Sequence, residues 1–398
     1  MAGFFKKGDA IAKFRELQEK YRGHDIVAVS GWESRPILLL LNQKLITEFI
    51  LTENENCRKE DCYPMPIGPG FMATYGKKAM HFRGIINKCF HYDQLVNICP
   101  QIYKIVMKHV EQLLEDFESL EEEFPEGYSQ DGATTPSDGF KCVSLRETLV
   151  EMLSESADVL LFGSSDYPKV NGLQIPAAID ELYTITSDHI EYSFLNFMTY
   201  GYLSYYKLTP TIRKAFKYGE QIKDAIANEY KKRCKKDLKD LGLNILDLMA
   251  KHDKESSPED KQSILEVVEN AVAVEQSFVG GARNVTESTL IQLATEPELQ
   301  KAYLKQVVAK MDPEKFGEYQ TYEKCTELSC FTKEVLRMYG SSGMLDDRDV
   351  VKEFGLGKYR FFKGTLVNVP FNAIQFDEKY YTNPYEFKID RFSEQNKD

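Results

Sequence analysis

Apolar residues recur every three or four positions along most of the chain, a period typical of helices that bury one face. Near the start, Ile11, Phe14, Leu17 and Tyr21 fall on one such face. The same spacing predicts further helices in residues 45–51, 79–124, 145–162, 176–236 and 263–293, and in shorter pieces as far as residue 338. We therefore expect helices to make up most of the molecule.

Two regions show the patterns of strands instead. Residues Ile26–Ser30 and 36–41 read as a pair of strands joined by a short turn. Residues 359–369 alternate around Lys363 and Gly364 like a β-hairpin, and the sequence after them has no regular pattern. The expected fold class is mainly α with small β-sheets (α+β), the strands lying towards both ends of the chain.

Three polar or Gly/Pro-rich breaks interrupt the helical pattern, at residues 64–70, 125–139 and 252–261. Each is expected to be a surface loop. None has the composition of a linker between domains, and the sequence has no internal repeat. We predict a single domain over residues 1–398.

The overall charge excludes some partners. The chain carries 50 basic and 62 acidic side chains, which gives a net charge of −12 and a pI near 5.2. Such a chain repels phosphate, so we expect no nucleic-acid partner. We predict no transmembrane segment, because no apolar run approaches the roughly 18 residues that a spanning helix needs. An intracellular location is expected, with the cytoplasm favoured and the mitochondrion left open.

The eight cysteines do not form a metal-binding pattern. No two of them are spaced as Cys-x-x-Cys, and Cys57 and Cys62 have no second pair nearby at zinc spacing. We interpret them as reduced thiols, most of them buried. No metal site is predicted.

The most informative motifs lie near the end of the chain. Glu334 and Arg337 are three residues apart and share one face of a predicted helix. Asp390, Arg391 and Phe392 follow after an irregular stretch. This order of elements, with the matching text around it, resembles the late part of the cytochrome P-450 family of haem-thiolate monooxygenases. The matching text lies in residues 322–338, 362–367, 373–374 and 377–392.

The resemblance implies a structural triad. In the family, the residues at the positions of Glu334, Arg337 and Arg391 form a buried ion cluster that clamps the irregular segment onto the helix. An arginine fork can bind a carboxylate through two parallel hydrogen bonds. Loss of one member would leave a buried charge without its partner.

The resemblance also implies a degenerate oxygen-activating helix. The family usually has Ala/Gly-Gly-x-Asp/Glu-Thr-Thr there, and residues 278–290 align with it without a gap. Asn284 stands at the acidic position and Val285 at the threonine position. An amide does not relay protons as a carboxylate does, and valine has no hydroxyl group. No catalytic residue is therefore predicted in this helix.

Two arginines match family positions that hold the haem propionates. Arg83 is one, although Ala79 replaces the tryptophan that the family has four residues earlier. Arg348 matches the second arginine. We interpret both as vestigial haem-propionate candidates.

The sequence has no cysteine after Cys330. In the family, the thiolate that binds the haem iron belongs to a Phe-x-x-Gly-x-x-x-Cys loop after the position of Phe392. The resemblance thus implies a P-450-like fold lacking its C-terminal haem-binding loop and last helix. A haem without its axial ligand loses its anchor, so we expect no cofactor. The leading hypothesis is a catalytically inactive structural or interaction subunit, with a protein partner covering the apolar face that the missing segment leaves open.

Two alternatives stay open. The first is a haem-thiolate monooxygenase whose ligand loop is missing here or supplied by another chain, and it would bind haem b. The second, weaker alternative is a protein that binds a lipid or sterol in the vacant haem cavity.

Overall fold

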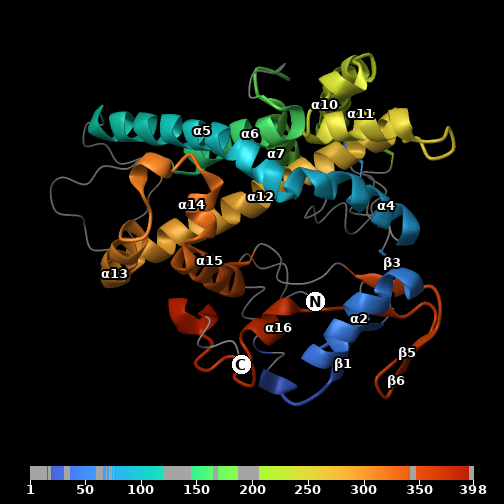
Figure 1. Ribbon diagram of the computed structural model, residues 1–398. Coiled ribbons are helices and arrows are strands. Elements are labelled where there is room, and N and C mark those ends of the chain that lie inside the picture. Colours follow the sequence, from blue (N-terminus) through green and yellow to red (C-terminus); the bar gives the residue numbers. More distant parts are fainter. Residues whose placement is uncertain are drawn as a thin grey trace.

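A computed structural model describes most of the chain (Figure 1). The residues that it describes are 16, 19–30, 36–59, 66–68, 70, 74, 76–119, 145–164, 169–186, 206–340 and 347–393. The predicted helix at residues 11–21 lies largely outside these ranges.

One long helix organises the molecule. Helix α12, Ile264–Thr295, begins at a capping box in which the Ser263 hydroxyl accepts a hydrogen bond from the Glu266 N–H at 3.2 Å. The Glu266 carboxylate in turn accepts from the Ser263 N–H at 2.9 Å. In the first half of α12, the residues from Val267 to Glu275 are buried, with the exception of Glu269. This burial follows from the run of small and branched apolar residues after Glu266.

Helices cover α12 from two sides (Figure 1). On one side lie α5 (Tyr92–Ser119), α6 (Leu145–Phe162), α7 (Ile175–Thr186), α10 (Pro210–Cys234) and α11 (Ile245–Glu255). Towards the other side lie α13 (Pro297–Val308), α14 (Tyr319–Glu323) and α15 (Thr326–Tyr339). Helix α4 (Gly76–Ile86) precedes α5 and packs against α11. Helices α6, α7, α10 and α15 all contact α12, so it lies at the centre of the helical layer.

A five-stranded sheet joins the two ends of the described chain. Its strand order is β1-β2-β7-β4-β3. The strands are β1 (Ile26–Ser30), β2 (Pro36–Leu40), β3 (Cys57–Lys59), β4 (Arg348–Val350) and β7 (Leu366–Asn368). Strand β2 pairs antiparallel with β1 and parallel with β7, where Ile37 faces Leu366. Helix α2 (Gln43–Asn56) packs beside this sheet in the second core cluster.

The hairpin predicted at residues 359–369 is wrong. Strand β6 (Tyr359–Phe361) pairs with β5 (Phe354–Leu356) and not with β7. Strand β7 is taken instead by β2 and β4. The apolar alternation was real, but it came from two strands of different sheets.

Three clusters of buried apolar side chains form the core. The largest lies among α4, α5, α6, α7, α10, α11 and α12. The second lies between α2 and the strands. The third is small and lies between α12, α13 and α15, where Tyr303, Phe331 and Val335 are buried together.

The predicted fold class is confirmed: the protein is mainly helical with small sheets. The paired strands at 26–30 and 36–40 and the long helix after Ser263 are also confirmed. Residues 79–124 are not one continuous helix, because a 3₁₀ turn at Asn87–Phe90 separates α4 from α5. The prediction of a single domain over residues 1–398 stays a prediction.

Short helices and turns make up the last described part of the chain. They are α16 (Phe371–Gln375) and the 3₁₀ turn η5 (Ile389–Phe392). Neither sheet extends beyond Asn368, so the segment after it must be held by other contacts.

Candidate functional site

The carboxylate of Glu334 on α15 is the centre of a buried ion cluster. It accepts two hydrogen bonds from Arg337, Nε to Oε2 at 2.8 Å and Nη2 to Oε1 at 2.9 Å. Its Oε1 also accepts from Arg391 Nε at 3.2 Å and from the Lys388 N–H at 3.0 Å. Glu334 is fully buried and Arg337 nearly so. The structure thus brings together the three residues of the predicted triad.

The two arginines extend this cluster into the irregular segment. Arg337 Nη1 donates to the carbonyl oxygens of Gln375 and Pro384, at 2.8 and 2.7 Å. Arg391 donates to the carbonyl oxygens of Thr382, Asn383 and Glu386 at 2.8, 3.3 and 3.1 Å respectively. Carbonyls that no strand or helix satisfies are therefore bound by charged donors. We call Glu334, Arg337 and Arg391 the clamp.

One stretch of α12 has free space beside it. A Cβ atom added at Gly280 or Gly281 would meet no other heavy atom within 4 Å. Asn284 lies one helical turn after them, and its buried Oδ1 accepts no hydrogen bond from any residue that the structure describes. A buried amide oxygen without a partner calls for a water or a ligand. Gly280, Gly281 and Asn284 therefore form a candidate wall for a bound molecule.

Val285 takes part in a different environment. It packs against the third core cluster, formed by Tyr303, Phe331 and Val335. This places it among α13 and α15. A valine is suited to that apolar contact, so the absence of a hydroxyl group there has a packing reason.

The two arginines proposed for the propionates differ from each other. Arg83 on α4 is exposed and makes no hydrogen bond or ion pair with any residue that the structure describes. Arg348 on β4 is buried and already has an interaction partner. An exposed, unpaired guanidinium is available to an anion, whereas a buried and partnered one is not. Arg83 is thus the better candidate of the two.

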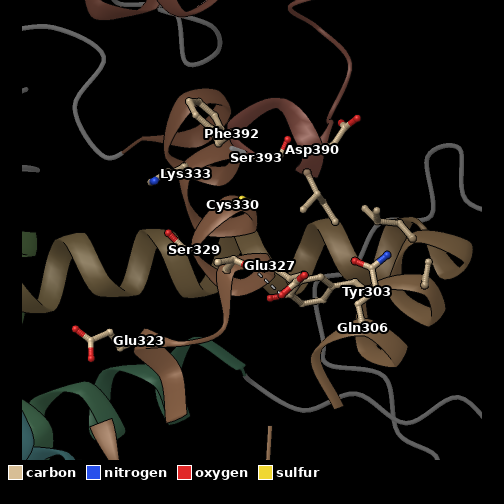
Figure 2. Close-up of a pocket in the computed structure, with 14 residues that line it drawn as sticks. Tyr303, Gln306, Glu323, Glu327, Ser329, Cys330, Lys333, Asp390, Phe392 and Ser393 are labelled. Carbon is tan, nitrogen blue, oxygen red and sulfur yellow. Dashed lines mark hydrogen bonds between the residues drawn. The ribbon is translucent and has the colours of Figure 1, made fainter. Parts of the chain in front are cut away.

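A pocket of about 690 Å³ lies between α13, α15 and η5, behind the clamp (Figure 2). The Tyr303 ring stacks at a tilt on Phe331, with centroids 4.4 Å apart, and lies beside Glu327. Burial, followed by the charges of Cys325 and Glu327, raises the pKa of Tyr303 to about 12. Lys333 points away from Tyr303 at the edge of the pocket (Figure 2). None of the candidate haem-side residues lines this pocket.

The described residues fit a haem only in part. Free space at Gly280 and Gly281, the unpartnered Asn284 oxygen and the unpaired Arg83 suit its wall and one propionate. No group of three or more ligating side chains that could hold a metal exists in the part of the chain that the structure describes. Six cysteines lie in that part and all are free thiols: Cys57, Cys89, Cys99, Cys234, Cys325 and Cys330. No cysteine follows Cys330, so the family's position for the axial thiolate is not among these residues.

Comparison with known proteins defines the fold and the class of this protein. The structure matches that of a retinoic acid-bound cyanobacterial CYP120A1 with a TM-score of 0.71, covering 99% of this chain and 79% of that one. At 15% sequence identity this likeness shows the fold alone. The family model for cytochrome P450 matches residues 2–398, so the chain belongs to the cytochrome P450 family.

Several curated relatives are cytochromes P450 whose names share the designation 3A. Cytochrome P450 3A17 of Cavia porcellus is 32% identical over 161 residues, which are 39% of this chain and 31% of the relative. Cytochrome P450 3A5 of Homo sapiens is 26% identical over 249 residues, which are 58% of this chain and 49% of the relative. The chain therefore spans less than half the length of these relatives.

The hypothesis of a catalytically inactive scaffold is wrong. A family match over nearly the whole chain, with relatives that are cytochromes P450, points to a monooxygenase. The opposite conclusion rested on the lack of a cysteine after Cys330. That observation describes residues 1–398 alone and does not show that the protein has no ligand cysteine. The expectation of no cofactor changes with it, because the family normally binds haem.

No helix in the described ranges is long and apolar enough to cross a membrane. Apolar side chains are exposed on α12 at Leu290 and Ile291 and on α13 at Leu304 and Val308. The expected protein partner that covers an apolar face stays a prediction.

Sequence reasoning missed two features of α12. Arg283 is not a stray charge, because its Nη1 donates to both carboxylate oxygens of Asp180 on α7, at 2.9 and 3.0 Å. Glu275 is a buried acid that the motifs did not include. Its signal was present in the sequence, since it follows the apolar run Ala271 to Val274 inside a helix.

Proposed function

We propose that residues 1–398 are part of a haem-thiolate monooxygenase whose ligand cysteine lies outside these residues. The single observation that carries this proposal is the clamp, which ties α15 to the irregular segment at residues 375–391. In the family this segment leads towards the ligand loop. A chain that retains four charge-assisted hydrogen bonds to Glu334 keeps that segment in a defined position.

When bound through a thiolate, haem supplies the activation of dioxygen, from which one oxygen atom is inserted into a substrate. This chain's residues would do the binding and positioning. Arg83 would hold one propionate through charge-assisted hydrogen bonds. Gly280 and Gly281 would let the backbone of α12 approach the bound group closely.

Asn284 would contribute a hydrogen bond and not a proton. Its side-chain amide can orient a water molecule or a polar group of the substrate through the unpartnered Oδ1. A carboxylate at this position would be able to exchange protons near neutral pH more readily. We therefore expect that the protons for the reaction arrive through ordered water.

Haem retention by Arg83 variants tests this assignment. In protein expressed from its full reading frame, Arg83→Met is expected to lower the haem-to-protein ratio after gel filtration at least about 10-fold, the equivalent of one charge-assisted contact. Lys88→Met is the matched control, because Lys88 is an exposed cation near the end of the same segment. Equal haem content in the two variants would contradict the role of Arg83. No haem in the unsubstituted protein would contradict the proposed function itself.

A further inference from the structure

Helices α6, α7 and α12 pack against one another (Figure 1), and α6 and α12 each carry one buried acidic side chain. Asp158 of α6 is 1% exposed and Glu275 of α12 is 2% exposed. Both belong to the stretch of the molecule that contains the largest apolar cluster, whose members include their direct neighbours Ala157, Val159 and Val274. Acidic residues are among those least often found fully buried.

Neither acid has the partners that a buried charge requires. Both carboxylate oxygens of Glu275 and the Oδ1 of Asp158 lack a hydrogen bond to any residue in the described ranges. The Ser154 hydroxyl, one turn before Asp158 on α6, is also buried without a partner. No salt bridge of either acid to a described basic side chain exists within 4.0 Å.

Basic side chains of α5 and α12 form ion pairs with acidic residues other than Asp158 and Glu275. Arg283 of α12 binds Asp180 of α7 at 2.9 Å. On the outer side, Glu155 of α6 binds Lys108 at 2.6 Å and His109 at 3.4 Å, both from α5. These pairs leave the two buried acids without a positive charge of their own.

Other helices that pack on α12 carry charges that are paired with one another. Arg233 of α10 lies between Glu229 and Asp247, at 3.1 Å from each. Tyr230 of α10 donates to Asp253 of α11. On α15, Glu334 and Arg337 belong to the clamp. The charges that act on Glu275 are those of Asp158 and Asp180.

We propose that Asp158 and Glu275 are both protonated at neutral pH and act as a pH-sensitive latch that holds α6, α7 and α12 together only while they are neutral. An isolated carboxylate in an apolar interior is far less stable than the protonated acid. A neutral acid can be accommodated in this core with a bound water at Ser154. An ionised one must either draw in water or separate the helices.

The pKa shifts agree in direction with this geometry. Burial, with a smaller effect of the Glu155 charge, raises the pKa of Asp158 to about 8. Burial raises the pKa of Glu275 well above its ordinary value, and the charges of Asp158 and Asp180 raise it further. A charge on Asp158 opposes the ionisation of Glu275.

The sign of the pH dependence follows from these shifts. In the unfolded chain both acids ionise in their ordinary range near pH 4. In the folded protein Asp158 keeps its proton to about pH 8, and the pKa of Glu275 is raised well above its ordinary value. The folded state therefore binds more protons between these limits, and stability falls as pH rises. Each proton in this difference changes the unfolding equilibrium constant about 10-fold per pH unit.

The test compares the pH dependence of unfolding in two variants. In the double variant Asp158→Asn, Glu275→Gln, the unfolding constant should rise less steeply between pH 6 and pH 8 than in the unsubstituted protein. The difference should be up to about 100-fold per pH unit, because two protons are involved. The matched control is Glu298→Gln, which removes an acid whose side chain is 90% exposed. It should leave the pH dependence unchanged.

A second readout includes a measurement on the unsubstituted protein, which does not depend on how well any variant folds. The infrared carbonyl stretch of a protonated carboxylic acid should be present in the unsubstituted protein at pH 7 and decrease in Glu275→Gln. Absence of that band at pH 7, or equal pH dependence in the double variant and the control, would overturn the latch. Neither readout requires bound haem, so the outcome is independent of the proposed function.

Discussion

Two buried glutamates in this molecule have opposite surroundings. Glu334 of α15 accepts hydrogen bonds from Arg337, Arg391 and the Lys388 N–H. Glu275 of α12 is buried to a similar degree but accepts none from the described residues. Equal burial therefore does not mean an equal electrostatic state. Glu334 can be an ion because two cations share its desolvation, whereas Glu275 has to remain neutral.

The two sites therefore have different roles: the clamp fixes a segment of the chain, whereas the buried acids make stability depend on pH. The clamp fixes a segment that has little regular structure, so it needs strong and directional bonds. The buried pair Asp158 and Glu275 lies among helices that already pack well through apolar contacts. Its carboxyl groups are compatible with that packing only while they are protonated, so the stability of the packing depends on pH.

The same substitution in the two places should have very different effects. Glu334→Gln would leave Arg337 and Arg391 without their carboxylate and is expected to lower the free energy of unfolding by about 3–5 kcal/mol. Glu275→Gln exchanges one neutral group for another in the folded protein, but it also removes the cost of protonating a carboxylate that is ionised in the unfolded chain at pH 7. It should therefore raise the free energy of unfolding, by up to about 3 kcal/mol at pH 7. Urea unfolding followed by circular dichroism measures both.

Equal destabilisation by the two variants would contradict this comparison. Lys301→Met serves as a reference for an ion pair that matters little, because the Lys301 and Glu298 side chains are 72% and 90% exposed. It should change stability by no more than about 0.5 kcal/mol.

A hydroxyl group at position 285 tests the packing of α12. Val285→Thr places a donor among Tyr303, Phe331 and Val335, where it is expected to cost about 2 kcal/mol. Val308→Thr is the matched control, since Val308 is 62% exposed on α13. If Val285→Thr proved neutral, the side chain would face open space and not the third core cluster.

The Asp180–Arg283 pair is an intermediate case between Glu334 and Glu275. Both side chains are 23% exposed, and Arg283 also lies 4.0 Å from the Glu287 carboxylate. Arg283→Met should therefore lower stability by only about 1 kcal/mol, with Arg283→Lys restoring part of the loss. Thermal unfolding of the unsubstituted protein and of the two Arg283 variants at pH 7 gives the order of their stabilities. A loss as large as that of Glu334→Gln would break the proposed ranking.

Local patterns predicted the elements that depend on nearby residues. The capping box at Ser263 and the apolar run after it define the start of α12. The alternation and turn at 26–40 define the strand pair β1 and β2. The Glu-x-x-Arg spacing placed Glu334 and Arg337 on one face, and the resemblance to the family supplied Arg391.

Features set by distant contacts could not be predicted in this way. Strand β7 pairs with β2 across more than 300 residues of sequence, so its alternation was assigned to the wrong partner. The alignment placed Val285 at the family's threonine position, but it did not show that the side chain packs against an apolar cluster of α13 and α15. Whether Glu275 has a hydrogen-bond partner depends on how α6, α7 and α12 pack together, which local sequence patterns do not show.

The reduced, carbon monoxide-treated absorption spectrum of protein from the full reading frame tests the central claim most directly. If the clamp belongs to a working haem-thiolate site, the spectrum should show the red-shifted Soret band of thiolate-ligated haem, with one haem per chain. A colourless protein, or a Soret band of haem bound through nitrogen, would contradict the account.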